Sequence, residues 1–169
     1  LKNYAHPGND GEYSSESVAD NIGGVLTLYQ NLIKKGVRTV VRLDVDTTVS
    51  ADHDALNQVW TNLTHNALQA MNYEGTLTVE AHRDANELSV SFEDTGPGVP
   101  SPIQSRIFEP FFTTKQIGEG TGLGLSISSD IVQRHGGHID VVSEPGLTRF
   151  TVRLPLNAEP ATEKDSVNE

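Results

Sequence analysis

Apolar side chains recur at the spacing of an amphipathic helix in three stretches of the chain. The first covers residues 20–35, with Asp20 as the expected N-cap and Gly36 as the stop. The second covers residues 52–72, and the third runs from about 122 to about 134. The stripe expected to be buried on the second helix comprises Leu56, Val59, Trp60, Leu63, Ala67, Leu68 and Met71. Each helix therefore has one apolar face that can pack on a sheet.

Five shorter segments have the alternation or the β-branched content of strands. They are residues 37–43, 76–83, 87–92, 139–143 and 149–154. Residues 84–86 form a turn that predicts a hairpin between the second and third of these strands. The order of helices and strands predicts an α+β fold in which the helices pack on one face of a mixed sheet.

The remaining segments divide the chain into a folded body and two ends. Residues 1–14 are predicted to be the end of a preceding helical region or a linker, and residues 15–156 a single domain. The last segment, 157–169, is acidic and almost without apolar residues, which predicts disorder. Residues 94–122 form a long irregular stretch rich in Gly, Pro and Thr, and such stretches are usually functional or disordered.

Charge and composition exclude several classes of function. The 169 residues carry 12 basic and 23 acidic side chains, a formal net charge of −11, which argues against nucleic-acid partners and anionic membranes. No apolar run approaches the roughly 18 residues that span a bilayer. The chain has no cysteine and begins with a polar segment unlike a signal peptide, which fits a cytoplasmic location.

Two asparagines on the second helix are the first candidates for chemistry. Asn62 and Asn66 lie four residues apart, so they share a face beside the apolar stripe. Asparagine is poor in helix interiors, so two of them here need polar partners. They are either amides bonded to local backbone or a site for Mg²⁺, which takes oxygen ligands and often nucleotide phosphates.

A carboxylate at the end of a strand is the second candidate. Asp94 follows the strand predicted over 87–92 and precedes Gly96 and Gly98. A buried, ionised aspartate needs hydrogen-bond donors, of which an adenine amino group is one. The two glycines let a flat ring approach the backbone closely. The alternative is an ordinary Gly-Pro turn with a solvated carboxylate.

Two further motifs flank the third helix. The glycine-rich segment 118–125 opens that helix, and such a loop can bind an anion through its free N–H groups and the helix dipole. It lacks the GK[ST] of a Walker loop, and a flexible hinge is the alternative. Residues 106–115 hold three of the five phenylalanines, which predict a hydrophobic plug or the hinge of a nucleotide lid. Lys115 could contact a terminal phosphate there.

Together these motifs resemble the ATP-binding catalytic domain of sensor histidine kinases, in the wider ATPase group of gyrase, the heat-shock chaperones and MutL. NQVWTNLTHNALQAM is similar to the asparagine box of that family, EDTGPGVP to its first glycine box and RIFEPFFTTK to its phenylalanine box. GEGTGLGLSIS is similar to the second glycine box, and SEPGLTRFTVRLP to a shortened final box. The resemblance implies a two-layer α/β sandwich of the Bergerat type, with a mixed sheet covered on one face by three helices.

The resemblance also implies roles for single residues. Asn66 would ligate Mg²⁺, Asn62 would support the phosphates or the metal shell, and Lys115 would act at the terminal phosphate; these three are the predicted catalytic residues. Asp94 would accept a hydrogen bond from the adenine amino group, with Thr148 and a water. The other predicted nucleotide contacts are Gly96, Gly98, Thr113, Thr114, Gly120, Thr121, Gly122, Leu123, Gly124 and Leu125. Residues 109–121 would form the lid.

The implied function is transfer of the ATP γ-phosphoryl group to a histidine on a helical hairpin, with a response regulator as the downstream partner. In gyrase-like relatives a glutamate base stands at the position of Asn62, and an amide cannot take a proton, so phosphotransfer is favoured over hydrolysis. The alternatives are a nucleotide-driven ATPase, a protein-serine kinase of the same fold and a degenerate nucleotide-sensing module.

The phosphoacceptor is expected upstream of this chain. In the family an acidic residue usually follows the reactive histidine, whereas Pro7 follows His6. The other histidines are expected to be surface or packing residues, and His65 to point about 100° away from Asn66 on the helix. Such kinases dimerise through the hairpin, so this chain alone is expected to be monomeric and inactive without the phosphoacceptor domain, and the whole protein homodimeric.

Overall fold

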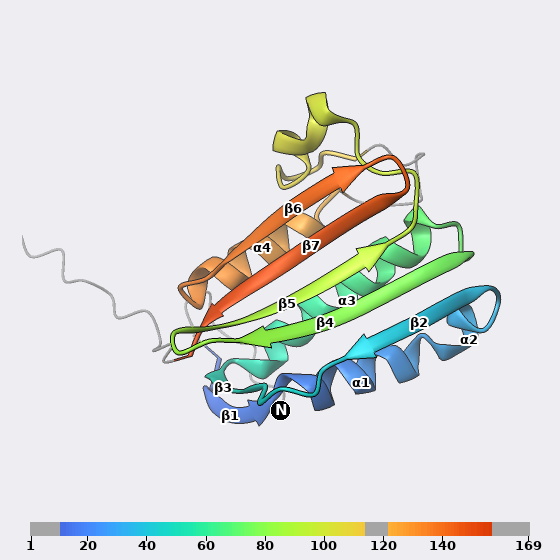
Figure 1. Ribbon diagram of the computed structural model, residues 1–169. Coiled ribbons are helices and arrows are strands. Elements are labelled where there is room, and N and C mark those ends of the chain that lie inside the picture. The colour runs from blue at the N-terminus through green and yellow to red at the C-terminus, as the bar shows by residue number, and fades with distance from the viewer. Residues whose placement is uncertain (1–10, 114–121, 157–169) are drawn as a thin grey trace, which may run out of the picture.

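The computed structural model describes residues 11–113 and 122–156 (Figure 1). A five-stranded mixed sheet forms one layer, in the order β2-β4-β5-β7-β6. β2 and β4 are parallel and the other neighbours are antiparallel. The strands are β2 (Val37–Arg42), β4 (Gly75–Arg83), β5 (Glu87–Asp94), β6 (His138–Glu144) and β7 (Leu147–Pro155). All five predicted strands are therefore present in a mixed sheet.

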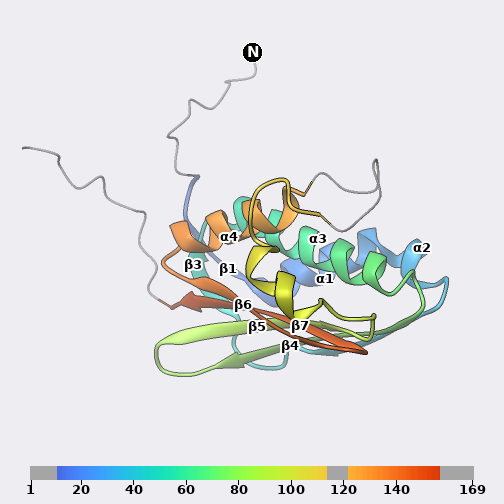
Figure 2. The same ribbon diagram turned by 90° about the horizontal axis from the view of Figure 1, so that it is seen from above.

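Helices cover one face of this sheet and leave the other open, as Figure 2 shows. They are α1 (Val18–Leu28), the short α2 (Gln30–Ile33), α3 (His53–Ala70) and α4 (Gly124–Arg134). A 3₁₀ helix, η1 (Ser101–Arg106), follows β5. The predicted α+β sandwich is confirmed, with α1, α3 and α4 as its three long helices. No helix in the described part of the chain is long and apolar enough to cross a membrane.

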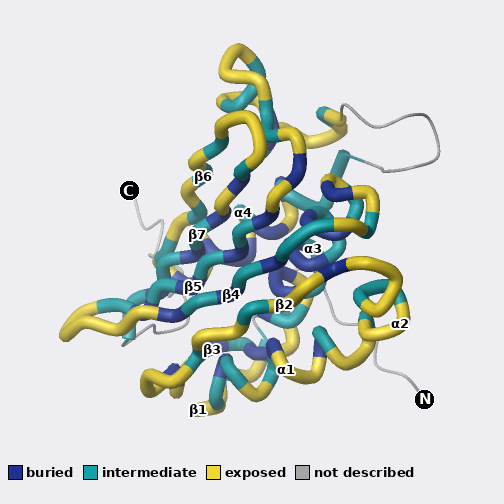
Figure 3. The backbone as a smooth tube through the Cα atoms, turned by 45° about the vertical axis from the view of Figure 1, so that its right-hand side comes forward, coloured by how far each residue is buried: buried dark blue, intermediate teal, exposed yellow. Residues whose placement is uncertain are grey.

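The core lies between α3 and the sheet. The seven stripe residues predicted on this helix, from Leu56 to Met71, are all buried. Trp60 stacks on Phe92 of β5 with ring centroids 6.0 Å apart. β5 alternates half-buried and buried positions along its length, and Figure 3 shows this alternation beside the buried centre of α3. The period of 2 on the strand and of 3.6 on the helix thus place both apolar faces in one interface.

The open face of the sheet carries ion pairs. Arg42 pairs with Glu80, Arg149 with Glu93, and Arg153 with both Glu87 and Asp140. Exposed pairs of this kind stabilise a fold only slightly. These arginines therefore lie on the face of the sheet away from the helix layer.

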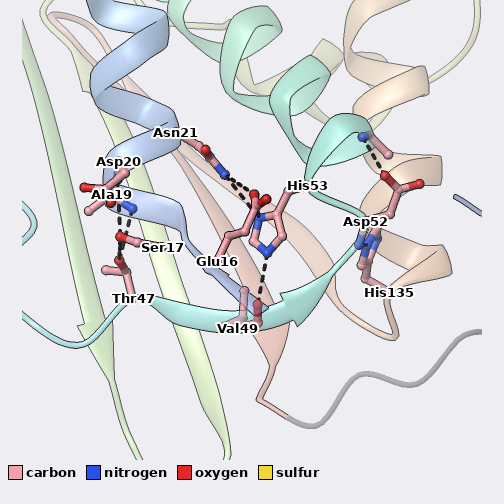
Figure 4. Close-up of polar contacts among 11 residues, drawn as sticks. Glu16, Ser17, Ala19, Asp20, Asn21, Thr47, Val49, Asp52, His53 and His135 are labelled. Atoms are coloured by element: carbon pink, nitrogen blue, oxygen red, sulfur yellow. Dashed lines mark hydrogen bonds and ion pairs between the residues drawn. The ribbon is translucent and has the colours of Figure 1, made fainter. Parts of the chain in front are cut away.

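The first helix begins earlier than its sequence predicts, so the prediction of Asp20 as N-cap is wrong. Ser17 is the N-cap, and its Oγ accepts the Asp20 N–H at 3.3 Å and lies 3.1 Å from Thr47 Oγ1. The Thr47 carbonyl also accepts the Val18 N–H, and Thr47 Oγ1 accepts the Ala19 N–H, as Figure 4 shows for Ala19. A residue distant in sequence therefore fixes where the helix starts.

Two other features of the first helical region were not predicted. The predicted helix over 20–35 is two helices, because Tyr29 leaves helical geometry at φ −92° and ψ 3°. A second, two-stranded sheet pairs β1 (Ser14–Ser17) with β3 (Thr48–Ala51). Strands of four residues give too short a pattern to be recognised by alternation.

Buried histidines attach this small sheet to the helices. His53 Nε2 lies 2.9 Å from the carbonyl of Val49, so it donates, and Nδ1 accepts from Asn21 Nδ2 at 3.2 Å (Figure 4). His135 Nδ1 donates to the Ile131 carbonyl at 2.8 Å, and Nε2 accepts the Asp52 N–H at 3.1 Å. Because a carbonyl only accepts, the ring nitrogen beside it carries a proton, so these contacts set which nitrogen of each ring donates and which accepts.

A His135→Ala variant is expected to lose about 2–4 kcal/mol of unfolding free energy. The change leaves a cavity beneath Tyr13, whose ring stacks on His135 at 5.3 Å, and removes the acceptor of the Asp52 N–H. Urea denaturation measures the loss. His82→Ala is the matched control, since that side chain is 77% exposed and should change stability by no more than about 0.5 kcal/mol. Equal effects of the two substitutions would contradict the role of His135 in attaching the small sheet to α4.

Candidate nucleotide site

A cavity of about 420 Å³ opens between α3, the start of α4 and one end of β5 and β7. Residues that lie far apart in the sequence meet on its wall. Of the predicted site residues, the structure brings together Asn62, Asn66, Asp94, Gly98, Thr113, Gly122, Gly124, Leu125 and Thr148. Leu123 is the N-cap of α4 and Gly96 lies beside Asp94. The motifs thus converge on one site.

Four predicted site residues, Thr114, Lys115, Gly120 and Thr121, lie outside the described residues, and so does most of the predicted lid over 109–121. Among the described residues that line the cavity there is no lysine or arginine, and Asp94 is the one carboxylate.

Asp94 is buried at the end of β5, with 3% of its surface exposed. Its Oδ1 accepts the Gly96 N–H at 2.9 Å. Burial raises the pKa of Asp94 to about 6, the Gly96 hydrogen bond opposes this, and the neighbouring Glu93 charge adds to it. The carboxylate is therefore held in the cavity wall with one oxygen engaged by the backbone.

The sheet register places a hydroxyl opposite this carboxylate. Asp94 is paired with Thr148 on β7, which is also buried. Thr148 is in turn paired with Ser143 on β6, and their hydroxyl oxygens are 2.8 Å apart. Directly opposed residues of antiparallel strands project on the same face, so these three side chains form one polar row at the end of the sheet.

The loop after β5 needs glycine at two positions. A Cβ on Gly96 would lie 2.8 Å from Asp94 Oδ1 and 2.9 Å from the Ala70 carbonyl. Gly98 has φ +87°, and a Cβ there would lie 2.3 Å from the Glu144 carbonyl. Both positions keep the chain close to α3 and to the β6–β7 turn, which leaves the cavity open.

The two asparagines occupy different places on the wall. Asn62 Nδ2 donates to the Gly124 carbonyl and to Ser128 Oγ, both at 3.1 Å, and so ties α3 to the first turn of α4. Asn66 lies one turn further along α3 on the same wall. A carboxylate could not replace Asn62 in the contact with the Gly124 carbonyl, because it has no proton to donate.

The start of α4 faces the cavity. Gly124 and Leu125, its first residues, line the wall, and the N-cap residue Leu123 has an apolar side chain that cannot cap the helix. The first N–H groups of a helix and the positive end of its dipole attract anions. This end of the cavity is therefore suited to a negatively charged group, and it lies across from the neutral amides of α3.

Several residues of the cavity wall were not predicted from the sequence. His65 was expected to point away from the site, but it lines the same cavity, since the wall spans more than 100° of the α3 surface. Its ring lies 6.0 Å from that of Tyr29. The apolar part of the wall is formed by Ala70, Val99, Pro100, Ile103, Ile107, Phe112 and Phe150. The apolar content of residues 99–112 could have indicated the five that lie there, whereas Ala70 and Phe150 come from α3 and β7.

The predicted phenylalanine plug is correct for two of its three members. Phe108 packs edge-on against Phe150, with ring centroids 6.1 Å apart. Phe112 lines the cavity, with the Arg106 guanidinium 4.7 Å from its ring centroid. Phe111 is 74% exposed and lies outside the plug. Its φ of +64° turns the chain toward Gly122, whose carbonyl accepts the Phe111 N–H at 2.8 Å.

An apolar slot with a buried acceptor at one end and a helix N-terminus with amides at the other is typical of a nucleotide-binding domain. The comparisons agree. The family model described as histidine kinase-, DNA gyrase B- and HSP90-like ATPase matches residues 51–158. This match covers more than half of the chain, which therefore belongs to that family.

Among curated relatives, the sensor histidine kinase ZraS of Escherichia coli O157:H7 is 44% identical over 110 residues, which are 64% of this chain and 24% of ZraS. The sensory histidine kinase/phosphatase NtrB of Klebsiella oxytoca is 33% identical over 162 residues, 89% of this chain and 46% of NtrB. The chain thus spans about a quarter to a half of the length of these relatives.

Among solved structures, the nucleotide-free catalytic domain of the histidine kinase ThkA superposes with a TM-score of 0.79 at 31% identity, covering 86% of this chain and 96% of that domain. ThkA in complex with the response regulator protein TrrA gives a TM-score of 0.76 at 28% identity and covers 86% of this chain and 42% of that one. The chain is accordingly an ATP-binding catalytic domain of the sensor histidine kinase type.

Proposed function

We propose that this domain binds Mg·ATP in the cavity and that, in the whole protein, it delivers the γ-phosphoryl group to a histidine on a helical hairpin. The observation that carries the proposal is that the two ends of the cavity differ in chemistry. The buried Asp94 and its partner Thr148 lie at the sheet end, where they suit an adenine amino group, and the N-terminus of α4 lies where phosphates would extend.

The residues present fit a magnesium ion. Asn66, one turn from Asn62 on the cavity wall, would supply a neutral amide oxygen, and Mg²⁺ binds oxygen ligands together with phosphates and water. No lysine or arginine of the described residues lines the cavity, so most of the phosphate charge needs another counter-charge. The ion would supply it, with Lys115 as a further cation for the terminal phosphate.

Asn62 contributes by position. Its amide holds the first turn of α4, and with it the N–H groups that would receive the phosphates. The one carboxylate among the described wall residues, Asp94, is engaged with the backbone at the opposite end of the proposed nucleotide. Asn62 itself cannot accept a proton near neutral pH. Transfer to an acceptor is therefore favoured over attack by an activated water.

Phosphoryl transfer requires that the γ-phosphate and the acceptor imidazole be correctly oriented. The bond between the γ-phosphorus and its bridging oxygen breaks, a bond to an imidazole nitrogen forms, and ADP is left. Such reactions are accelerated mainly by alignment and charge neutralisation. The domain would hold the triphosphate between α3 and α4, and the acceptor histidine would come from the hairpin upstream in the same protein or in its dimer mate. A response regulator would then take the phosphoryl group.

The test has two stages. Calorimetry on this chain is expected to show ATP binding that weakens at least about 10-fold when EDTA replaces Mg²⁺. The chain extended upstream through the hairpin, incubated with γ-labelled ATP, is expected to gain phosphate that is stable in alkali and labile in acid, as phosphohistidine is. Replacing the hairpin histidine by glutamine should remove the label.

Three results would contradict the proposal. Absence of ATP binding by the chain would reject the nucleotide site. Rapid release of inorganic phosphate by the chain without an acceptor would favour an ATPase. Binding without label transfer in the extended chain would favour a nucleotide-sensing module.

A further inference from the structure

Ser143 is the last member of the polar row at the end of the sheet, and it lies beyond the cavity wall. It stands on β6, opposite Thr148 of β7, which is opposite Asp94 of β5. It is the first residue of the segment SEPGLTRFTVRLP, but no role was predicted for it from the sequence. Its hydroxyl nevertheless reaches the loop that forms one side of the proposed nucleotide site.

The Ser143 hydroxyl contacts three groups. Its Oγ accepts the Val99 N–H at 2.7 Å, lies 2.8 Å from Thr148 Oγ1 and 3.3 Å from the Leu147 carbonyl. A hydroxyl has one proton and two acceptor sites, so these contacts can saturate it. Ser143 thereby links the wall loop, the β6–β7 turn and the buried hydroxyl beside Asp94.

Gln104 completes the attachment from the other side. This residue lies on η1, and its Nε2 donates to the Val99 carbonyl at 2.8 Å and to the Ser143 carbonyl at 3.2 Å. Both main-chain polar groups of Val99 are thus bonded to side chains, one to Ser143 and one to Gln104. The position of this cavity-lining residue depends on these two side chains.

We propose that Ser143 and Gln104 are positioning residues for the nucleotide base. They fix the loop around Gly98 and Val99 at the width that admits a flat ring beside Asp94, and Ser143 also orients the Thr148 hydroxyl. The inference rests on the proposed function, since it concerns the base end of the same cavity. Neither residue touches the nucleotide; each acts through Val99 or Thr148.

The geometry of the loop distinguishes this role from general stabilisation. The loop already passes through one left-handed residue, Gly98, and lies against the β6–β7 turn. Loss of the Ser143 hydroxyl leaves the Val99 N–H and the Thr148 hydroxyl to find new partners, and water entering the cavity is the nearest source. If the loop moves or water enters in this way, the space for the base becomes narrower or is partly filled by water.

A Ser143→Ala variant is expected to bind Mg·ATP about 10-fold more weakly, and ADP by the same factor, because the change lies at the base end and away from the phosphates. Ser143→Thr keeps the hydroxyl on a strand and should recover most of the affinity. Ser91→Ala is the matched control, since this serine lies on β5 with its side chain on the open face of the sheet, and it should bind as the wild type does. Calorimetry at 10 °C measures binding, circular dichroism at the same temperature checks that each variant is folded, and thermal melts record any change in stability separately.

A double-mutant cycle tests whether the two residues act on one loop. Gln104→Met keeps the length of the side chain and removes its donor. This change is expected to weaken ATP binding about 5-fold, and the Ser143→Ala, Gln104→Met pair to weaken it little more than Ser143→Ala alone. Independent residues would instead give the product of the two factors, about 50-fold.

The outcomes separate this proposal from the function on which it rests. Failure of the wild-type chain to bind ATP would reject the proposed function and this inference together. Wild-type binding with unchanged affinity in Ser143→Ala would overturn the positioning role alone, even if the variant melts at a lower temperature. Multiplying factors in the double mutant would likewise overturn the shared action on Val99.

Discussion

An Asp94→Asn variant is expected to bind ATP about 100-fold more weakly than the wild-type chain and yet to unfold at a higher temperature at pH 7. The Gly96 N–H needs an acceptor, so the amide oxygen of the asparagine would take the place of Oδ1. Its NH₂ group would then point where the second carboxylate oxygen was. A donor would face the adenine amino group, which is also a donor, and a charge-assisted hydrogen bond would be lost.

The gain in stability follows from the raised pKa of Asp94. The unfolded chain releases this proton near 3.8 and the folded chain near 6, so the folded state binds more protons in between. The contribution of this group to stability is therefore present below pH 3.8 and is lost as the pH rises to about 6, a loss of ~3 kcal/mol. The asparagine variant does not ionise, and at pH 7 it should recover ~1–3 kcal/mol.

Calorimetric titration with Mg·ATP and urea denaturation at pH 4, 5, 6 and 7 measure both effects. Asp130→Asn is the control, because that carboxylate is exposed on α4 and its neutralisation should change neither property appreciably. Equal ATP affinity of Asp94→Asn and the wild type would refute the role of Asp94 in base recognition. A variant less stable than the wild type at pH 7 would show that the buried carboxylate is better satisfied than its burial indicates.

A Gly98→Ala variant is expected to lose about 2–5 kcal/mol of unfolding free energy together with most of its ATP affinity. At φ +87° an alanine is in a region that costs roughly 1–2 kcal/mol. Its Cβ would also meet the Glu144 carbonyl at 2.3 Å, which requires a shift of backbone on one side or the other, at a cost of about 1–3 kcal/mol. Moving the loop changes the wall on which the base is proposed to lie.

Gly124→Ala provides the comparison within the same cavity. A Cβ there would come no closer than 3.6 Å to any neighbour, and that neighbour is the Asn62 side chain. Alanine is also the better residue in the first turn of a helix, so stability should be unchanged or slightly higher. Denaturation curves and calorimetry on both variants measure the difference. If Gly98→Ala were tolerated as well as Gly124→Ala, the tight contact between the loop and the β6–β7 turn would not limit the site.

The long periodic segments were predicted correctly because their patterns are strong. The stripe on α3 identified its buried face residue by residue, and the alternation along β5 and β7 predicted two strands of the sheet. The start of α1 was predicted three residues late, because Thr47, thirty residues away, supplies the contacts that begin the helix at Ser17. Local pattern contains no information about such a partner.

The residue types of the site were predicted from the sequence, whereas several of its contacts were not. The types of residue that suit a nucleotide, namely paired amides, a carboxylate at a strand end and glycines before a helix, could be read from the sequence. The sequence could not show that His65 lines the cavity or that Phe111 is exposed rather than part of the plug. Nor could it show that the Asn62 amide donates to the start of α4. Each of these depends on which side chain from another element comes within reach.

The acidic net charge of −11 is a property of the sequence, whereas the position of each charge is a property of the fold. The sequence alone determined the acidic composition, the helices and strands with strong periods, and the chemical character of the motifs, because these are properties of residues and their local spacing. Only the tertiary structure decided that the described arginines pair with acids on the open face of the sheet or lie outside the cavity wall, and that Asp94, Thr148 and Ser143 stand in one row. Strand register and helix packing set those distances, and both arise from contacts between segments that the chain order keeps apart.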